Sequence, residues 1–198
     1  MGKGRLEAFS DGVLAILITI MVLELKVPRG ADLHALMPFL PSLAWYLLSF
    51  VFVGIYWNNH HHLLHASHRV NGAVLWANLH LLFWLSLVPV ATTWLGENPS
   101  APIPVALYGA ILFMAAIGFT LLVLALVAAN GGKDSALAQA LGRDFKGKIS
   151  VVLYGAAIAL AFVRASVAEA LYVVVALIWL IPDRRIERAT LKQPGQEH

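Results

Sequence analysis

Histidine is the residue type in this chain best suited to chemistry, because a neutral imidazole is a common ligand for zinc, copper and iron. The chain has 198 residues and eight histidines. Five of them fall in one short stretch: His60, His61, His62, His65 and His68. Residues four apart lie on one face of an α-helix, so His61 and His65 are spaced to share a metal ion. One hypothesis is therefore a metal-binding membrane enzyme or transporter.

Other features of the sequence favour a plainer interpretation of these histidines. A metal-dependent membrane enzyme of this kind needs several histidine-rich segments, and only His80 lies elsewhere at a similar predicted depth. Cysteine is absent, and no Gly-x-Ser-x-Gly or glycine-rich phosphate loop occurs. The alternative is that the histidines line a helix end at the membrane surface, some hydrogen-bonded and others solvated. We expect neither an enzyme nor a bound metal or other cofactor.

The amino-acid composition indicates what kind of helices carry these histidines. Hydrophobic residues make up 60% of the chain and charged residues only 13%, whereas soluble domains have about 45–50% and 25%. The sequence thus predicts an all-α integral membrane protein, one domain over residues 1–198 with six transmembrane helices. The predicted spans are residues 5–25, 35–65, 71–95, 103–129, 149–164 and 167–182. Apolar residues at helical spacing also predict an interfacial helix near residues 134–146.

The basic residues predict an orientation, because lysine and arginine accumulate on the cytoplasmic side of a membrane protein. With six spans and both termini inside, the cytoplasmic set is Lys3, Arg5, Arg69, Lys133, Arg143, Lys146, Lys148, Arg184, Arg185, Arg188 and Lys192. The opposite side holds only Lys26, Arg29 and Arg164. We therefore expect a multi-pass protein of the cell membrane with cytoplasmic N and C termini.

Polar side chains recur at one depth of the first three spans. The first span contributes Arg5, Ser10 and Asp11, the second Trp57 and His60, and the third Asn78. Ionisable groups in a membrane helix are costly, and polar groups there need partners. Asp11 can accept from Arg5, from an imidazole or from the Trp57 indole. The pattern favours a buried network that holds three helices in register; the alternative is that each group reaches the interface separately.

Two stripes run along the first span beyond Asp11. One is branched and apolar: Ile16, Ile20 and Leu23. The other is built of small residues: Gly12, Ala15 and Thr19. Small side chains permit close helix approach, so we expect this second stripe to pack against spans two and three. The branched stripe faces either lipid or an axis where several copies meet, and rings of such residues gate a pore by dewetting.

A family resemblance rests on these same residues. Arg5-x-x-x-Phe9-Ser10-Asp11-Gly12 resembles the signature that opens the first helix of the transmembrane protein 175 family of potassium channels. Trp57-Asn58-Asn59-His60 resembles the family's Trp-x-x-His near the end of helix two. Asn78 and the later Leu87-Val88-Pro89 resemble its helix three. The resemblance covers spans one to three.

The resemblance implies a channel that passes potassium ions down their gradient. A chain with one six-helix repeat is similar to the prokaryotic members, which implies a homotetramer with helix one lining a central pore. The narrow hydrophobic point then falls at Ile16, with Ile20 and Leu23 as further layers and the Thr19 hydroxyl near the filter. Position 15 is alanine where some members have serine. Arg5, Asp11, Trp57, His60 and Asn78 match the family's interhelical network.

The usual potassium-selective loop is missing, since Thr-Val-Gly-Tyr-Gly occurs nowhere in the chain. The carbonyls of an uninterrupted helix are occupied by its own hydrogen bonds. Selection must then come from pore width, dehydration and Thr19, so we expect weak discrimination of potassium over sodium.

Overall fold

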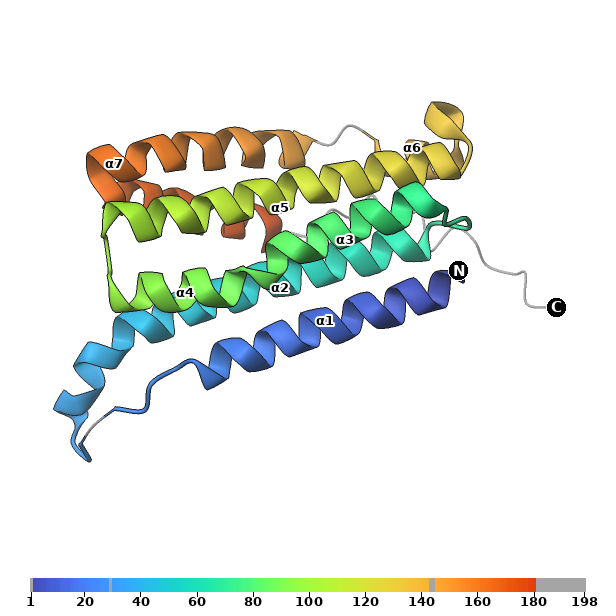
Figure 1. The fold of residues 1–198 in the computed structure, drawn as a ribbon. Coiled ribbons are helices and arrows are strands. Elements are labelled where there is room, and N and C mark those ends of the chain that lie inside the picture. The colour runs from blue at the N-terminus through green and yellow to red at the C-terminus, as the bar shows by residue number, and fades with distance from the viewer. Residues whose placement is uncertain (1, 29, 143–144, 181–198) are drawn as a thin grey trace.

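The computed structural model of the chain describes residues 2–28, 30–142 and 145–180. Every regular element among these residues is helical, which confirms the all-α prediction. In chain order the elements are α1 (Lys3–Leu23), the 3₁₀ helix η1 (Leu33–Phe39), α2 (Leu40–His65), α3 (Gly72–Ser86), α4 (Val88–Glu97), α5 (Pro102–Ala129), the 3₁₀ helix η2 (Gly132–Asp134), α6 (Ala136–Leu141) and α7 (Phe145–Leu180). The long helices run side by side as one bundle (Figure 1).

The last helix is folded in two. Helix α7 has 36 residues, about 54 Å if straight, but Arg164 has non-helical backbone angles (φ −154°, ψ 91°). The two halves then run antiparallel (Figure 1). Trp179 Nε1 donates to Ser150 Oγ at 2.8 Å, and the rings of Tyr154 and Tyr172 lie 6.3 Å apart. The fold-back gives the bundle six long helical segments, each mostly apolar.

Proline changes two of the predicted spans. The chain from Leu33 to Phe39, around Pro38, is a 3₁₀ helix, and the α-helix starts only at Leu40. The predicted span 71–95 is divided between Ser86 and Val88. Pro89 has no N–H to donate to the Leu85 carbonyl and its ring collides with that carbonyl, so an uninterrupted α-helix is excluded there.

The interfacial helix is shorter than the predicted 134–146. Ser135 caps it by accepting from the Ala138 N–H at 3.1 Å, and the helix ends at Leu141. Gly142 has backbone angles of φ +58° and ψ −147°, which glycine tolerates and which cannot continue an α-helix. Some predicted features lie outside the described residues: Arg29, Arg143, the end of the sixth span at 181–182, and Arg184, Arg185, Arg188 and Lys192 in the tail.

Polar contacts fasten each end of the bundle. At one end, the Asn130 side chain accepts from the His68 and Arg69 N–H groups and donates to the Arg69 carbonyl. The same end carries the start of α1, where Lys3 Nζ donates to the His65 carbonyl. At the other end, Lys26 pairs with Glu97.

Helix α5 lies between α3 and α7 and packs on both. Two of its glycines permit this closeness. A Cβ at Gly118 would lie 3.0 Å from the Leu81 Cα in α3, and one at Gly109 would lie 2.1 Å from the Tyr172 hydroxyl in α7. Larger residues at either position would force the helices apart.

Candidate functional site

Helix α1 has one face turned into the protomer. Its buried residues are Leu6, Ser10, Leu14, Leu17 and Met21. The steps of three and four between them define one side of an α-helix. This face packs on α2, α3 and α4.

The opposite face of α1 is exposed and mostly apolar. Ile16 is 57% exposed, Leu23 81%, and Ile20 is also exposed. Thr19 lies on the same side, and its hydroxyl donates to the Ile16 carbonyl at 2.8 Å. Because the proton is used within the helix, the lone pairs of Thr19 Oγ1 remain as acceptors on the exposed surface.

The small-residue stripe does not pack as predicted. Gly12, Ala15 and Thr19 are all exposed, and a Cβ at Gly12 would meet nothing within 4 Å. The expectation that this stripe contacts spans two and three is wrong for the protomer. The reason is that leucine and methionine side chains, rather than closely approaching backbones, make the contact of α1 with its neighbours.

A buried chain of hydrogen bonds joins three helices. His60 Nε2 in α2 lies 2.7 Å from Asn78 Oδ1 in α3, and Asn78 Nδ2 donates to Ser10 Oγ in α1 at 3.0 Å. Ser10 Oγ in turn donates to the Leu6 carbonyl at 2.9 Å. All three side chains are buried. This series of hydrogen bonds brings together three residues of the predicted network, Ser10, His60 and Asn78.

The donor and the acceptor of each hydrogen bond in this series follow from Ser10, the last side chain in it. Ser10 gives its only proton to the Leu6 carbonyl, so it must accept from Asn78. The Asn78 amide nitrogen therefore faces Ser10 and its oxygen faces His60. An amide oxygen only accepts, so His60 carries a proton on Nε2.

The remaining predicted network residues lie outside this buried chain. The Trp57 indole donates to Asp11 Oδ1 at 3.0 Å, which links α2 to α1 at an exposed position. Phe9 is exposed. Arg5 is exposed too, and its guanidinium forms no hydrogen bond or ion pair with any part of the chain that the structure describes. Arg5, an imidazole and the Trp57 indole are the three predicted donors to Asp11, and the indole is the one that donates a hydrogen bond to it.

The histidine stretch forms a stack of rings. His61 and His65 are stacked with centroids 6.0 Å apart, and the Trp57 ring stacks on His61 at 6.1 Å. His62 contacts His61 edge to face, and His68 is exposed in the turn after α2. Among residues 2–28, 30–142 and 145–180, no group of three or more His, Asp or Glu side chains is arranged to hold a metal ion. His80 stands apart on α3, where its ring meets Trp84.

A second buried polar chain was not predicted from the sequence. Ser49 Oγ in α2 lies 2.7 Å from Thr92 Oγ1 in α4 and 2.9 Å from the Tyr108 hydroxyl in α5. Thr92 donates to the Val88 carbonyl. The only signal in the sequence is that hydroxyl side chains occur in three apolar spans, a pattern too common to single out.

These features define the class: a multi-pass, all-α membrane protein whose polar side chains join its helices internally. Comparison with known proteins defines the family. The family model described as endosomal/lysosomal potassium channel TMEM175 matches residues 5–89. A protein named potassium channel from Chryseobacterium sp. (strain P1-3) is 55% identical over 189 residues, which cover 96% of this chain and 98% of that protein.

Solved structures agree with this assignment. The crystal structure of a lysosomal potassium-selective channel TMEM175 homolog from Chamaesiphon minutus superposes with a TM-score of 0.79 at 31% identity, covering 92% of this chain and 97% of that one. A protein named endosomal/lysosomal proton channel TMEM175 from Gallus gallus is 39% identical over 75 residues, 32% of this chain and 15% of that protein. The chain belongs to the TMEM175 family, and the predicted family is confirmed. The family consists of ion channels and not of enzymes.

Proposed function

We propose that this protein is a potassium channel, a homotetramer in which α1 lines a central pore. The observation that carries the proposal is the exposed branched stripe of Ile16, Ile20 and Leu23, which lies outside the buried face of α1. Four copies of this stripe around one axis give stacked hydrophobic rings. The names of the relatives from Chryseobacterium and Chamaesiphon support potassium as the permeant ion.

The constriction of the pore is the ring of Ile16 side chains, and Ile20 and Leu23 add further layers. A narrow apolar ring resists ion passage because water leaves it. Thr19 is the polar group on this face, and its outward lone pairs suit a partly dehydrated cation. Since the backbone carbonyls of α1 are engaged in the helix, selection of potassium over sodium is weak.

The polar groups beside the pore hold the pore helix in place. The buried chain from His60 through Asn78 to Ser10 fixes α1 against α2 and α3, and Trp57 adds an exposed link to Asp11. Arg5 and Phe9 belong to the same end of α1. The role of this network is to set the rotation of α1 about its own axis, so that the branched stripe faces the other subunits.

The distribution of charge supports cytoplasmic N and C termini in the cell membrane. The end of the bundle that holds the start of α1 also carries described lysine and arginine side chains of the turns and of α7: Arg69, Lys133, Lys146 and Lys148. The opposite end carries Lys26 and Arg164. The richer end is cytoplasmic by the positive-inside rule.

Potassium flux from liposomes tests the constriction. An asparagine at position 16 wets the ring, and lowering the barrier by about 1.4 kcal/mol raises flux about tenfold. The matched control is Leu124→Asn on α5, because Leu124 is 59% exposed and Ile16 57%. The control should leave flux unchanged. Equal flux from wild type and Ile16→Asn would contradict the constriction, and an equal rise in both variants would place Ile16 in lipid.

The role of Thr19 is tested by the bi-ionic reversal potential. Thr19→Ala removes the outward oxygen, so we expect the potassium-to-sodium permeability ratio to fall towards one. Stringent selection that survives this change would contradict a filter based on Thr19.

A further inference from the structure

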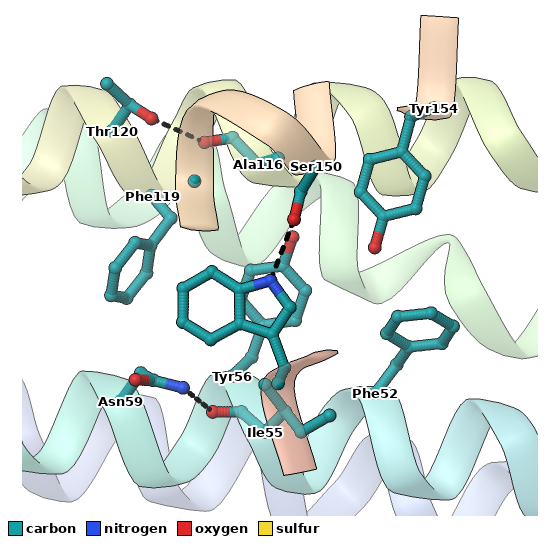
Figure 2. A pocket seen from close by; sticks show the side chains of 11 residues that line it. Phe52, Ile55, Tyr56, Asn59, Ala116, Phe119, Thr120, Ser150 and Tyr154 are labelled. Carbon is teal, nitrogen blue, oxygen red and sulfur yellow. Dashed lines mark hydrogen bonds between the residues drawn. The ribbon is translucent and has the colours of Figure 1, made fainter. Parts of the chain in front are cut away.

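A cavity lies beside the bundle axis, away from the exposed face of α1. It has a volume of about 40 Å³ and is lined by α2, α5 and both halves of α7 (Figure 2). Aromatic rings form much of its wall: Phe52, Tyr56, Phe119, Tyr154 and Trp179. Ser150 and Tyr154 come from the first half of α7 and Trp179 from the second, so the cavity exists because the helix folds back at Arg164.

Two hydroxyl groups of the wall lack acceptors. The other polar side chains are engaged within the protein: Asn59 donates to the Ile55 carbonyl, Thr120 to the Ala116 carbonyl, and Ser150 to the Lys146 carbonyl. The hydroxyls of Tyr56 and Tyr154 form no hydrogen bond within the part of the chain that the structure describes. Tyr154 is only 2% exposed, and its hydroxyl points into the cavity (Figure 2).

An unpaired buried hydroxyl is destabilising, so these two groups indicate a ligand that accepts hydrogen bonds. The surrounding rings indicate that the rest of the ligand near them is apolar. Acceptor oxygens flanked by hydrocarbon are the chemistry of a carboxylic ester.

Positive charge lies at the rim of the cavity. Lys146 Nζ lies 5.9 Å from the centre of the Trp179 ring, and Lys146 comes one helical turn before the cavity-lining Ser150, whose hydroxyl donates to its carbonyl. The charge therefore lies at the end of the cavity nearest the start of α7, and the Tyr154 hydroxyl lies one further turn along the same helix.

We propose that the cavity holds the glycerol-ester region of an anionic phospholipid. Its ester oxygens accept hydrogen bonds from Tyr56 and Tyr154, and its phosphate lies beside Lys146. One water-sized group needs about 10–15 Å³ of such space, so a cavity of about 40 Å³ fits an ester and not a whole lipid. The acyl chains lie outside, past the exposed Thr120. This site does not depend on the proposed pore.

The test is lipid binding by the purified, delipidated full-length protein, measured by native mass spectrometry. The probes are phosphatidylglycerol and phosphatidylcholine with identical acyl chains. We expect phosphatidylglycerol to bind more tightly, and the double variant Tyr56→Phe/Tyr154→Phe to weaken it about tenfold through two lost hydrogen bonds. Lys146→Gln should reduce the preference for phosphatidylglycerol about fivefold, since the cation beside the cavity is lost.

The matched control is Tyr46→Phe, which removes a tyrosine hydroxyl from the opposite half of α2 and should leave lipid binding unchanged. Equal affinity for the two lipids would overturn the proposal. So would unchanged phosphatidylglycerol binding in the tyrosine double variant.

A thermal-unfolding measurement separates lipid from trapped water. If a lipid ester fills the cavity, Tyr154→Phe does not lower the melting temperature of the lipid-free protein, because it removes an unpaired hydroxyl, and it reduces the rise that phosphatidylglycerol produces. If water alone bridges the hydroxyls, the lipid-free variant melts at a lower temperature and the effect of phosphatidylglycerol is unchanged. The second result overturns the proposal.

Discussion

The two faces of α1 differ in polarity. On a helix at the surface of a soluble protein the inward face is apolar and the outward face polar, whereas α1 places hydrogen-bonded polar groups on its inward face. The face turned into the protomer contains the polar link, with Ser10 hydrogen-bonded to Asn78 among leucines. Beyond Asp11 the outward face is apolar except for Thr19, with Ile16, Ile20 and Leu23 exposed. Lipid offers no hydrogen bonds, so polar groups gain most by meeting each other inside the protein. Helix α1 is therefore held from within and leaves its outward face available to other copies.

Adjacent residues on these two faces give the largest expected contrast. Leu17 is 5% exposed and Ile16 57%. Leu17→Asn should lower the free energy of unfolding by about 3–5 kcal/mol, because it removes core packing and buries an amide. Ile16→Asn should change it by less than about 1 kcal/mol. Unfolding in mixed detergent micelles measures both, and equal losses would abolish the distinction between the faces.

The polar link itself is tested by Asn78→Leu. The substitution leaves the His60 N–H without an acceptor and takes the donor from Ser10, so we expect a loss of about 2–4 kcal/mol. Asn58→Leu is the control, because Asn58 lies exposed on the neighbouring α2. The control should alter the free energy of unfolding by no more than about 0.5 kcal/mol. A stable Asn78→Leu variant would show that the buried chain does not hold α1.

The exposed link should matter least. Trp57→Phe removes the indole donor to Asp11 but keeps an aromatic ring beside His61. Exposed polar contacts contribute little, so the expected loss is below about 1 kcal/mol in the same unfolding assay. A loss as large as that of Asn78→Leu would mean that Trp57 is buried in the assembled channel.

Much of the fold and part of the site follow from the sequence. Apolar stretches of membrane length predict helices because a chain in lipid must satisfy its backbone hydrogen bonds locally. Charge and proline positions are equally local signals: the bend falls at Arg164, the last residue of the fifth predicted span. The motif from Arg5 to Gly12 indicates the family by residue order alone, since that order is unusual in a membrane helix.

Other features depend on how the helices are rotated against each other, and sequence spacing does not contain that information. Tertiary structure decided that Asp11 meets Trp57 rather than Arg5, and that the leucine face of α1, not the Gly12–Ala15–Thr19 stripe, is buried. It also joined Ser49, Thr92 and Tyr108, and folded α7 back to close a cavity. The sequence by itself determined which segments are helices and what they carry. Packing between helices decided which side chains meet, because each rotation is set by all neighbouring contacts at once.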